Sequence, residues 1–154
     1  MKSQKANNMI ILSLLLVLFL SPSSLCNIAV GKSHLYPLAI KGYDTVAYFK
    51  YGKALQGEES FSIQWHGMIW YFLNKENRNL FAKSPDKYAP QYDGYCAWAM
   101  TEARKAQTNP KVWKIVNGRL YLNCSKSAHE KWGRDIPGNI KKADKNWLRF
   151  FNNN

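Results

Sequence analysis

The sequence is poor in acidic residues, histidine and cysteine. Ten Asp and Glu stand against 22 Lys and Arg, which gives a net charge of +12, and the chain has three His and three Cys. The basic residues are spread along the chain, which is typical of a solvated surface, so we expect no nucleic-acid partner. The cysteines are too few for a disulfide framework.

Several motifs that would indicate an active site are also missing. The chain has no Gly-rich phosphate loop, no G-x-S-x-G nucleophile elbow and no paired-carboxylate spacing. It has neither C-x-x-C nor H-x-x-x-H, the spacings typical of many metal sites. We therefore expect a protein that is not an enzyme.

The one long apolar run lies near the N-terminus. Residues 9–20 follow two lysines and are too short for an ordinary transmembrane helix, which needs about 20 apolar residues. Residues 24–26 then fit the small-x-small pattern of a signal-peptide cleavage site. We predict a periplasmic or secreted protein with no integral membrane segment after cleavage; an uncleaved N-terminal anchor is the alternative. The predicted parts are a signal peptide (1–26), a polar lead-in (27–40) and one domain (41–150).

The rest of the chain predicts an α+β domain. FSIQW-HG-MIWYF and VWKIV-NG-RLYLN each read as a β-hairpin, because two aromatic or β-branched runs flank a Gly-containing tight turn. The turn glycines, Gly67 and Gly118, are 51 residues apart, which suggests two related hairpin–helix units. The expected fold is a small antiparallel sheet built from two β-hairpins, each followed by a helix, with additional helices packed on it.

Capping residues and periodicity place the remaining elements. The predictions are a strand over Thr45–Phe49, a helix from the cap Asn74 through Lys83 that Pro85 closes, a helix over Gly94–Arg104, a helix that starts at a Ser127–Glu130 capping box and stops at Gly133, and a last helix over Ile136–Trp147.

The segment YAPQYDGYCAWAM (residues 88–100) gathers aromatic residues around Cys96. Three interpretations of Cys96 stay open: a small buried hydrophobe on the inner face of a helix, a metal ligand, or a nucleophile. A nucleophile would need a neighbouring His and a lowered pKa. The sequence also leaves open whether Cys96 pairs with Cys124.

The aromatic residues beside Cys96 either fill the core or wall a pocket for a small ligand. His66 lies in the turn of the first hairpin. Arg78 is expected to form an ion pair with a carboxylate such as Asp44 or Asp93. The predicted ligand-binding residues are Tyr92, Tyr95, Cys96, Trp98 and His66, and the candidate metal ligands are Cys96 and His66.

Four segments together resemble the YHS-domain family, in particular its small exported bacterial members. They are KGYDTVAYF, FSIQWHGMIWYFLNKENRNLFAKSPDKYAPQYDGYCAWAM, VWKIVNGRLYLN and KADKNW, and they form one collinear run from about residue 40 to 147. The resemblance implies a YHS/TRASH-like core and a role in metal handling, with a transition metal ion as the candidate cofactor.

The chain departs from the family pattern where metal-associated members have ligand cysteines. Ala47 and Leu73 stand at those two positions, and Asp93 replaces the first Gly of the Y-G-G-Y-C-A pattern. Apolar side chains cannot bind a soft metal. We therefore expect a binding or sensing module for a small ligand or metal ion that lacks the YHS metal cysteines. The alternatives are a thiol-dependent redox protein or enzyme that uses Cys96, and a structural partner of an envelope protein complex.

Overall fold

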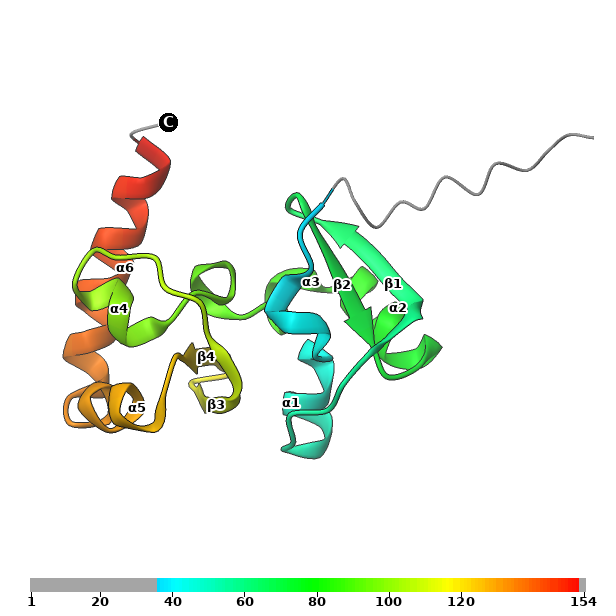
Figure 1. The fold of residues 1–154 in the computed structure, drawn as a ribbon, viewed down its shortest axis with the longest axis horizontal. Coiled ribbons are helices and arrows are strands. Elements are labelled where there is room, and N and C mark those ends of the chain that lie inside the picture. Colours follow the sequence, from blue (N-terminus) through cyan, green and yellow to red (C-terminus); the bar gives the residue numbers. More distant parts are fainter. Residues whose placement is uncertain (1–35, 153–154) are drawn as a thin grey trace, which may run out of the picture. The chain divides into compact units, whose positions relative to one another are not determined.

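The structure, a computed structural model, describes residues 36–152 (Figure 1). The predicted signal peptide and most of the lead-in lie outside these residues. Among the described residues, none of the helices has the length and apolarity needed to cross a membrane. The elements are η2 (Ala39–Gly42), α1 (Thr45–Tyr51), β1 (Glu58–Trp65), β2 (Met68–Phe72), α2 (Lys75–Lys83), α3 (Pro85–Tyr88), η3 (Gln91–Gly94), α4 (Ala97–Thr101), β3 (Asn109–Val116), β4 (Arg119–Asn123), α5 (Lys126–Gly133) and α6 (Ile136–Asn152).

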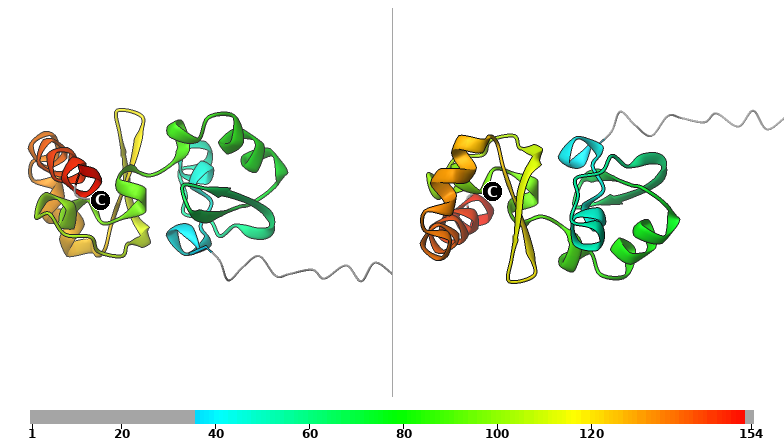
Figure 2. Two further views of the ribbon diagram at one scale, coloured as in Figure 1. Left: turned by 90° about the horizontal axis from the view of Figure 1, so that it is seen from above. Right: turned by 90° about the horizontal axis from the view of Figure 1, so that it is seen from below.

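The α+β class and both hairpin–helix units are confirmed. β1 pairs antiparallel with β2, β3 pairs with β4, and each hairpin makes its own two-stranded sheet. The turn residues His66 and Asn117 both have positive φ (48° and 50°), as the tight turns require. Helix α2 follows the first hairpin and α5 follows the second, and Figure 2 shows each hairpin from two further sides.

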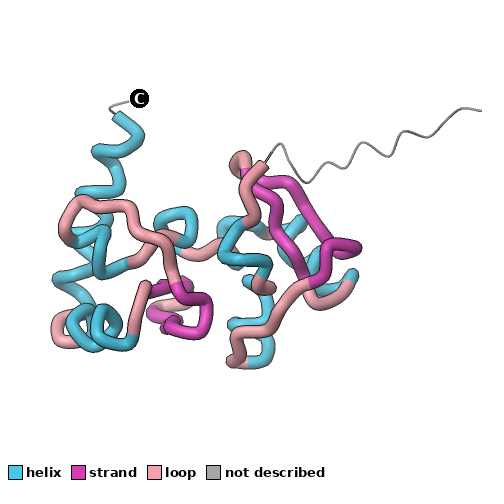
Figure 3. Tube along the Cα trace, viewed as in Figure 1, coloured by secondary structure: helices cyan, strands magenta, loops and turns pink. Residues whose placement is uncertain are grey.

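The two units are copies of one arrangement. Each consists of a kinked 3-10 helix, a short α-helix, a hairpin and a capped helix, in that order (Figure 3). Both hairpins carry an irregularity at the same place, between Glu58 and Ser62 and between Asn109 and Trp113. Equivalent strand positions are therefore 51 residues apart, as the turn glycines predicted.

The backbone bonds of the two copies also correspond. The amide of Asp44 donates to the carbonyl of Leu55 at 2.9 Å, and the amide of Cys96 donates to that of Ala106 at 3.0 Å. Asp44 and Cys96 each precede the short helix of their copy. Cys96 is thus the counterpart of Asp44 in the second copy.

The predicted strand over Thr45–Phe49 is wrong, because these residues form α1. The side chain of Asp44 caps this helix and accepts from the amides of Val46 (2.8 Å) and Ala47 (3.2 Å). Gly52 ends it in the left-handed conformation, with φ 61°. The β-branched and aromatic residues favour a strand, but the two caps decide for a helix.

The predicted helix over Gly94–Arg104 is present only as α4. Tyr92 and Asp93 have positive φ (59° and 51°), Cys96 is extended, and Ala103 turns the chain with φ 53°. The segment is therefore helical only over Ala97–Thr101, with Cys96 before the helix and Ala103 after it.

The other helix ends were predicted more closely. Asn74 caps α2 through the amide of Asn77 at 2.9 Å, as expected. Pro85, however, starts the short helix α3. Ser125, not Ser127, caps α5 through the amide of Ala128 at 3.1 Å. Helix α6 begins at Ile136 as predicted and runs beyond Trp147.

The core is mainly aromatic and has two large parts. One part contains Tyr48, Trp70, Phe72 and Phe81 together with side chains of β4. The other holds the second copy against α6 and contains Tyr92, Ala97, Met100, Tyr121, Trp132 and Ala143. The kink of η3 and helix α6 are thereby fixed against each other, which positions the cleft described next.

Candidate functional site

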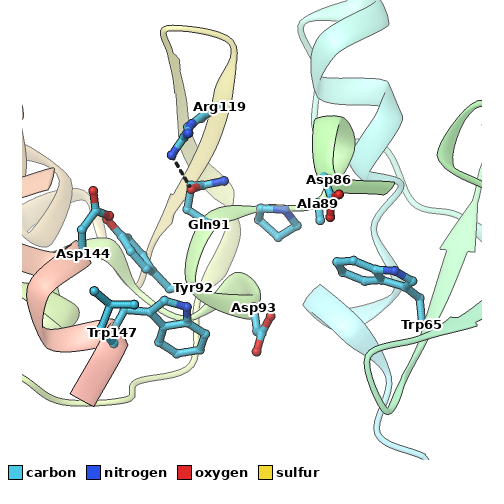
Figure 4. A pocket seen from close by; sticks show the side chains of 11 residues that line it. Trp65, Asp86, Ala89, Gln91, Tyr92, Asp93, Arg119, Asp144 and Trp147 are labelled. Atoms are coloured by element: carbon cyan, nitrogen blue, oxygen red, sulfur yellow. Dashed lines mark hydrogen bonds between the residues drawn. The ribbon is translucent and has the colours of Figure 1, made fainter. Parts of the chain in front are cut away.

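A cleft of about 430 Å³ is the candidate site (Figure 4). Figure 4 shows Trp65 and Asp86 on one side of it and Tyr92, Asp144 and Trp147 on the other. The residues that line it come from the end of β1, from α3, from the segment 89–93, from the start of β4 and from α6. They are Trp65, Asp86, Ala89, Pro90, Gln91, Tyr92, Asp93, Arg119, Asp144, Trp147 and Leu148.

The cleft is acidic, although the protein as a whole is basic. Three of the chain's ten acids, Asp86, Asp93 and Asp144, line it, and Arg119 is the one basic residue that does. The Arg119 guanidinium points at Gln91, at 3.4 Å from its Oε1. The local charge therefore opposes the net charge of +12.

One wall of the cleft is held by a partly buried hydrogen bond. The hydroxyl of Tyr92 donates to Oδ1 of Asp144 at 2.8 Å, and Tyr92 is only 4 % exposed. Burial and the neighbouring carboxylate raise the pKa of Tyr92, so this hydroxyl keeps its proton over the physiological range. The bond fixes the acid of α6 against η3 and orients its second oxygen.

Asp93 lies at the rim, within reach of a histidine. Its Oδ1 is 4.0 Å from Nδ1 of His66, and the His66 ring stacks on Trp65 with centroids 3.6 Å apart. Burial raises the pKa of the Asp93 carboxyl, while His66 and Lys105 act in the opposite direction. His66, predicted from its position in a turn, thus contacts two residues of the cleft.

A cation already lies against the tryptophan of the other wall. The Lys105 ammonium is 5.6 Å from the ring centroid of Trp147 and 4.8 Å from that of Phe150. A third ring, Tyr95, lies 5.6 Å away. The aromatic residues beside the cleft therefore make a cation–π contact within the protein.

The five predicted ligand-binding residues do not form one site. Tyr92 lines the cleft and His66 lies beside it. Tyr95 contacts Lys105 and Trp147 but is not part of the lining. Trp98 is half-buried, and its amide donates to Oδ1 of Asn123 at 3.1 Å.

Cys96 is completely buried, away from the cleft lining, beside Ala99 and Ala128. Burial raises the pKa of its thiol to about 11, and the Cys124 thiol adds to this rise. His129 contacts Nδ2 of Asn123 at 3.3 Å. The environment fits the small buried hydrophobe better than the nucleophile, which would need a lowered pKa.

The candidate metal ligands have different neighbours. Cys96 contacts Asn123 and Cys124, whereas His66 contacts Trp65 and Asp93. In residues 36–152, no three His, Cys, Asp or Glu side chains come together as metal ligands would. The structure does not assemble a metal site from the two predicted residues.

The ion pair expected for Arg78 is wrong. Its guanidinium donates to Oδ1 of the neighbouring Asn79 at 3.0 Å. Asp44 instead accepts from Asn77 at 2.6 Å and from backbone amides, and Asp93 faces His66. Asp44 is therefore satisfied by other donors, and Asp93 lies beside His66 instead of Arg78.

Sequence reasoning missed most of the cleft. Its acids lie on α3, η3 and α6, far apart in the sequence, and no local spacing joins them. The one available signal is in KKADKNW, where Asp144 is a single acid among lysines and lies three residues before Trp147. This spacing puts both on one face of a helix.

Comparison of the chain with protein-family models, curated proteins and solved structures found no match. The resemblance to YHS domains accordingly stays a prediction from the sequence.

Proposed function

We propose that the protein is an exported binding module, of the YHS type, that holds a small positively charged ligand in the cleft. The observation that carries this proposal is that Asp86, Asp93 and Asp144 line one cleft together with two tryptophans, in a protein that is basic as a whole. Carboxylates attract a cation, and tryptophan faces bind one by cation–π attraction. Export rests on the pattern of residues 1–26.

The cleft favours an organic cation over a bare metal ion. Its volume of about 430 Å³ is in the range of small-molecule sites. The apolar lining residues, Trp65, Trp147 and Leu148, offer no ligand atoms to a hydrated metal ion but suit a flat or apolar ligand body. Metal binding is the second candidate, because carboxylates such as Asp86 also suit hard cations.

Three probes that share one ring but differ in charge test the proposal: benzyltrimethylammonium, benzyl alcohol and benzoate. Titration calorimetry should give heat of binding for the cation, weaker binding for the alcohol and none for benzoate. Asp86→Asn should weaken binding of the cation about fivefold to tenfold, or about 1–1.4 kcal/mol, because it removes one attractive charge.

Asp135→Asn is the matched control. Asp135 is exposed and does not line the cleft, so its loss removes the same charge elsewhere and should leave the affinity unchanged. Benzoate binding as tightly as the cation would contradict the proposal. Binding of Mn²⁺ or Zn²⁺ that is lost in Asp86→Asn, with no binding of the organic cation, would replace it with the metal function.

The affinity for benzyltrimethylammonium should fall on acidification. Asp93 attracts the cation only when it is ionised, and burial raises its pKa above the usual range of an aspartate. The contribution of Asp93 to the affinity is therefore full above that raised pKa and is lost as the pH falls through it. Titrations across the acidic range should show this loss in the wild type and in His66→Gln. In Asp93→Asn the affinity at neutral pH should be lower than in the wild type, and it should change less with pH. A pH profile identical to that of the wild type would show that Asp93 does not contribute.

A further inference from the structure

The two copies of the repeat differ at one pair of contacting positions. In the first copy, the amide of Leu73 donates to the carboxylate of Asp44 at 2.8 Å. In the second copy, the amide of Cys124 donates to the sulfur of Cys96 at 3.1 Å. Both copies therefore make the same contact between a backbone amide and a side chain, but only the second copy has a cysteine at each of the two contacting positions. The chain has three cysteines in all, and two of them meet here.

The geometry brings the two side chains within reach of each other. The Cα of Cys124 is about 1.5 Å from its amide nitrogen, so it lies within about 4.6 Å of the Cys96 sulfur. In a disulfide the two Cβ atoms are about 3.8 Å apart, so the paired residues must lie against each other, as the backbone of Cys124 and the sulfur of Cys96 do here. The Cys124 thiol is also one of the groups that raise the pKa of Cys96, after burial itself.

One thiol is accessible and the other is not. Cys124 is exposed at the end of β4, whereas Cys96 is 0 % exposed at the start of α4. The charged and titratable groups around the pair come from two further segments. Arg104 and Glu102, which pair at 2.6 Å, follow α4 near the two thiols, and His129 of α5 reaches the pair through Asn123.

We propose that Cys96 and Cys124 are a reversible dithiol–disulfide pair. The oxidant is a disulfide of another thiol compound, such as oxidised glutathione or the disulfide of an exported oxidoreductase. The thiolate of Cys124 attacks one sulfur of the oxidant and releases the other as a thiolate, which leaves a mixed disulfide. Cys96 then loses its proton to water, its thiolate attacks the Cys124 sulfur, and the second thiol leaves. Two protein thiols are oxidised and one external disulfide is reduced to two thiols.

The burial of Cys96 controls the second step. Its thiol ionises only with a pKa of about 11, so closure of the bond from the mixed disulfide is slow at neutral pH and accelerates as the pH rises. The resulting bond ties the start of α4 to the end of β4.

The test uses the full chain, reduced with dithiothreitol and then incubated with oxidised glutathione. Free thiols are alkylated and the protein is digested with trypsin without reduction. The expected product is peptide 88–104 joined to peptide 120–126, with two hydrogens fewer than the separate peptides. The oxidised protein should melt about 10 °C higher, and dithiothreitol should reverse this shift.

Two variants keep the outcome clear. Cys26→Ser removes the third cysteine and should leave the joined peptides and the shift unchanged. Cys124→Ser changes an exposed side chain, so it should fold, lose the joined peptides and show no shift with oxidant. Oxidation that stops at glutathione on Cys124, with Cys96 alkylated only after denaturation, would overturn the proposal, as would a disulfide from either residue to Cys26.

Discussion

Replacing Asp44 by alanine is expected to destabilise the protein by about 3–5 kcal/mol, because one buried carboxylate satisfies four donors. Its Oδ1 caps α1 at the amides of Val46 and Ala47. Its Oδ2 accepts from the amide of Leu73 at 2.8 Å and from Nδ2 of Asn77 at 2.6 Å. Asp44 is 0 % exposed, so water cannot replace the lost acceptor without a change in packing.

Denaturant unfolding of Asp44→Ala beside Asp135→Ala measures this effect. Asp135 also accepts a backbone amide with one carboxylate oxygen, from Gly138 at 3.0 Å, but it is exposed. Its loss should cost about 1 kcal/mol or less, as for an ordinary helix cap. Equal losses in the two variants would show that the buried bonds of Asp44 contribute no more than a surface cap.

The hairpins were predictable because their signals are local. A Gly-containing turn between two β-branched or aromatic runs is enough to specify a hairpin, and both are present with the expected turns. Asn74 was recognised as a cap for the same reason, since the residue that it caps lies three positions ahead.

Helix α1 was missed because the composition of Thr45–Tyr51 favours a strand, whereas the residues that cap the segment favour a helix. Val46 and the aromatic residues fit a strand, but Asp44 and Gly52 supply a start and an end for one short helix. Tertiary bonds add to the preference, since Asp44 also binds Leu73, 29 residues away. No window of local sequence contains that bond.

The candidate site was harder to predict than the fold. Cys96 is conspicuous in the sequence, but the comparison of the two repeats makes it the buried counterpart of Asp44. The acids of the cleft are inconspicuous, and only the packing of η3 against α6 brings Asp144 to Tyr92. The kinked backbone at Tyr92 and Asp93 leaves no periodic signal.

The second large effect is expected at Trp132, which holds the core of the second copy. It is 0 % exposed and its ring lies 5.3 Å from Tyr121; the equivalent rings of the first copy, Phe81 and Trp70, lie 5.4 Å apart. Trp132→Ala leaves a cavity of nearly a whole indole and should cost about 3–5 kcal/mol of unfolding free energy. Denaturant unfolding with an unchanged m-value measures it.

Trp132→Phe is the matched variant, and it should cost much less, about 1–2 kcal/mol. The first copy already uses phenylalanine at this position, as Phe81. The indole Nε1 of Trp132 is buried and has no acceptor among the described residues, so the smaller ring removes an unsatisfied donor together with apolar contacts. In Trp132→Phe, removal of the unsatisfied donor offsets part of the stability lost with the apolar contacts. In Trp132→Ala the loss of contacts is much larger, because nearly the whole ring is replaced by a cavity. A phenylalanine variant as unstable as the alanine variant would mean that the indole N–H makes a bond, to a buried water for example, that the second copy needs and the first does not.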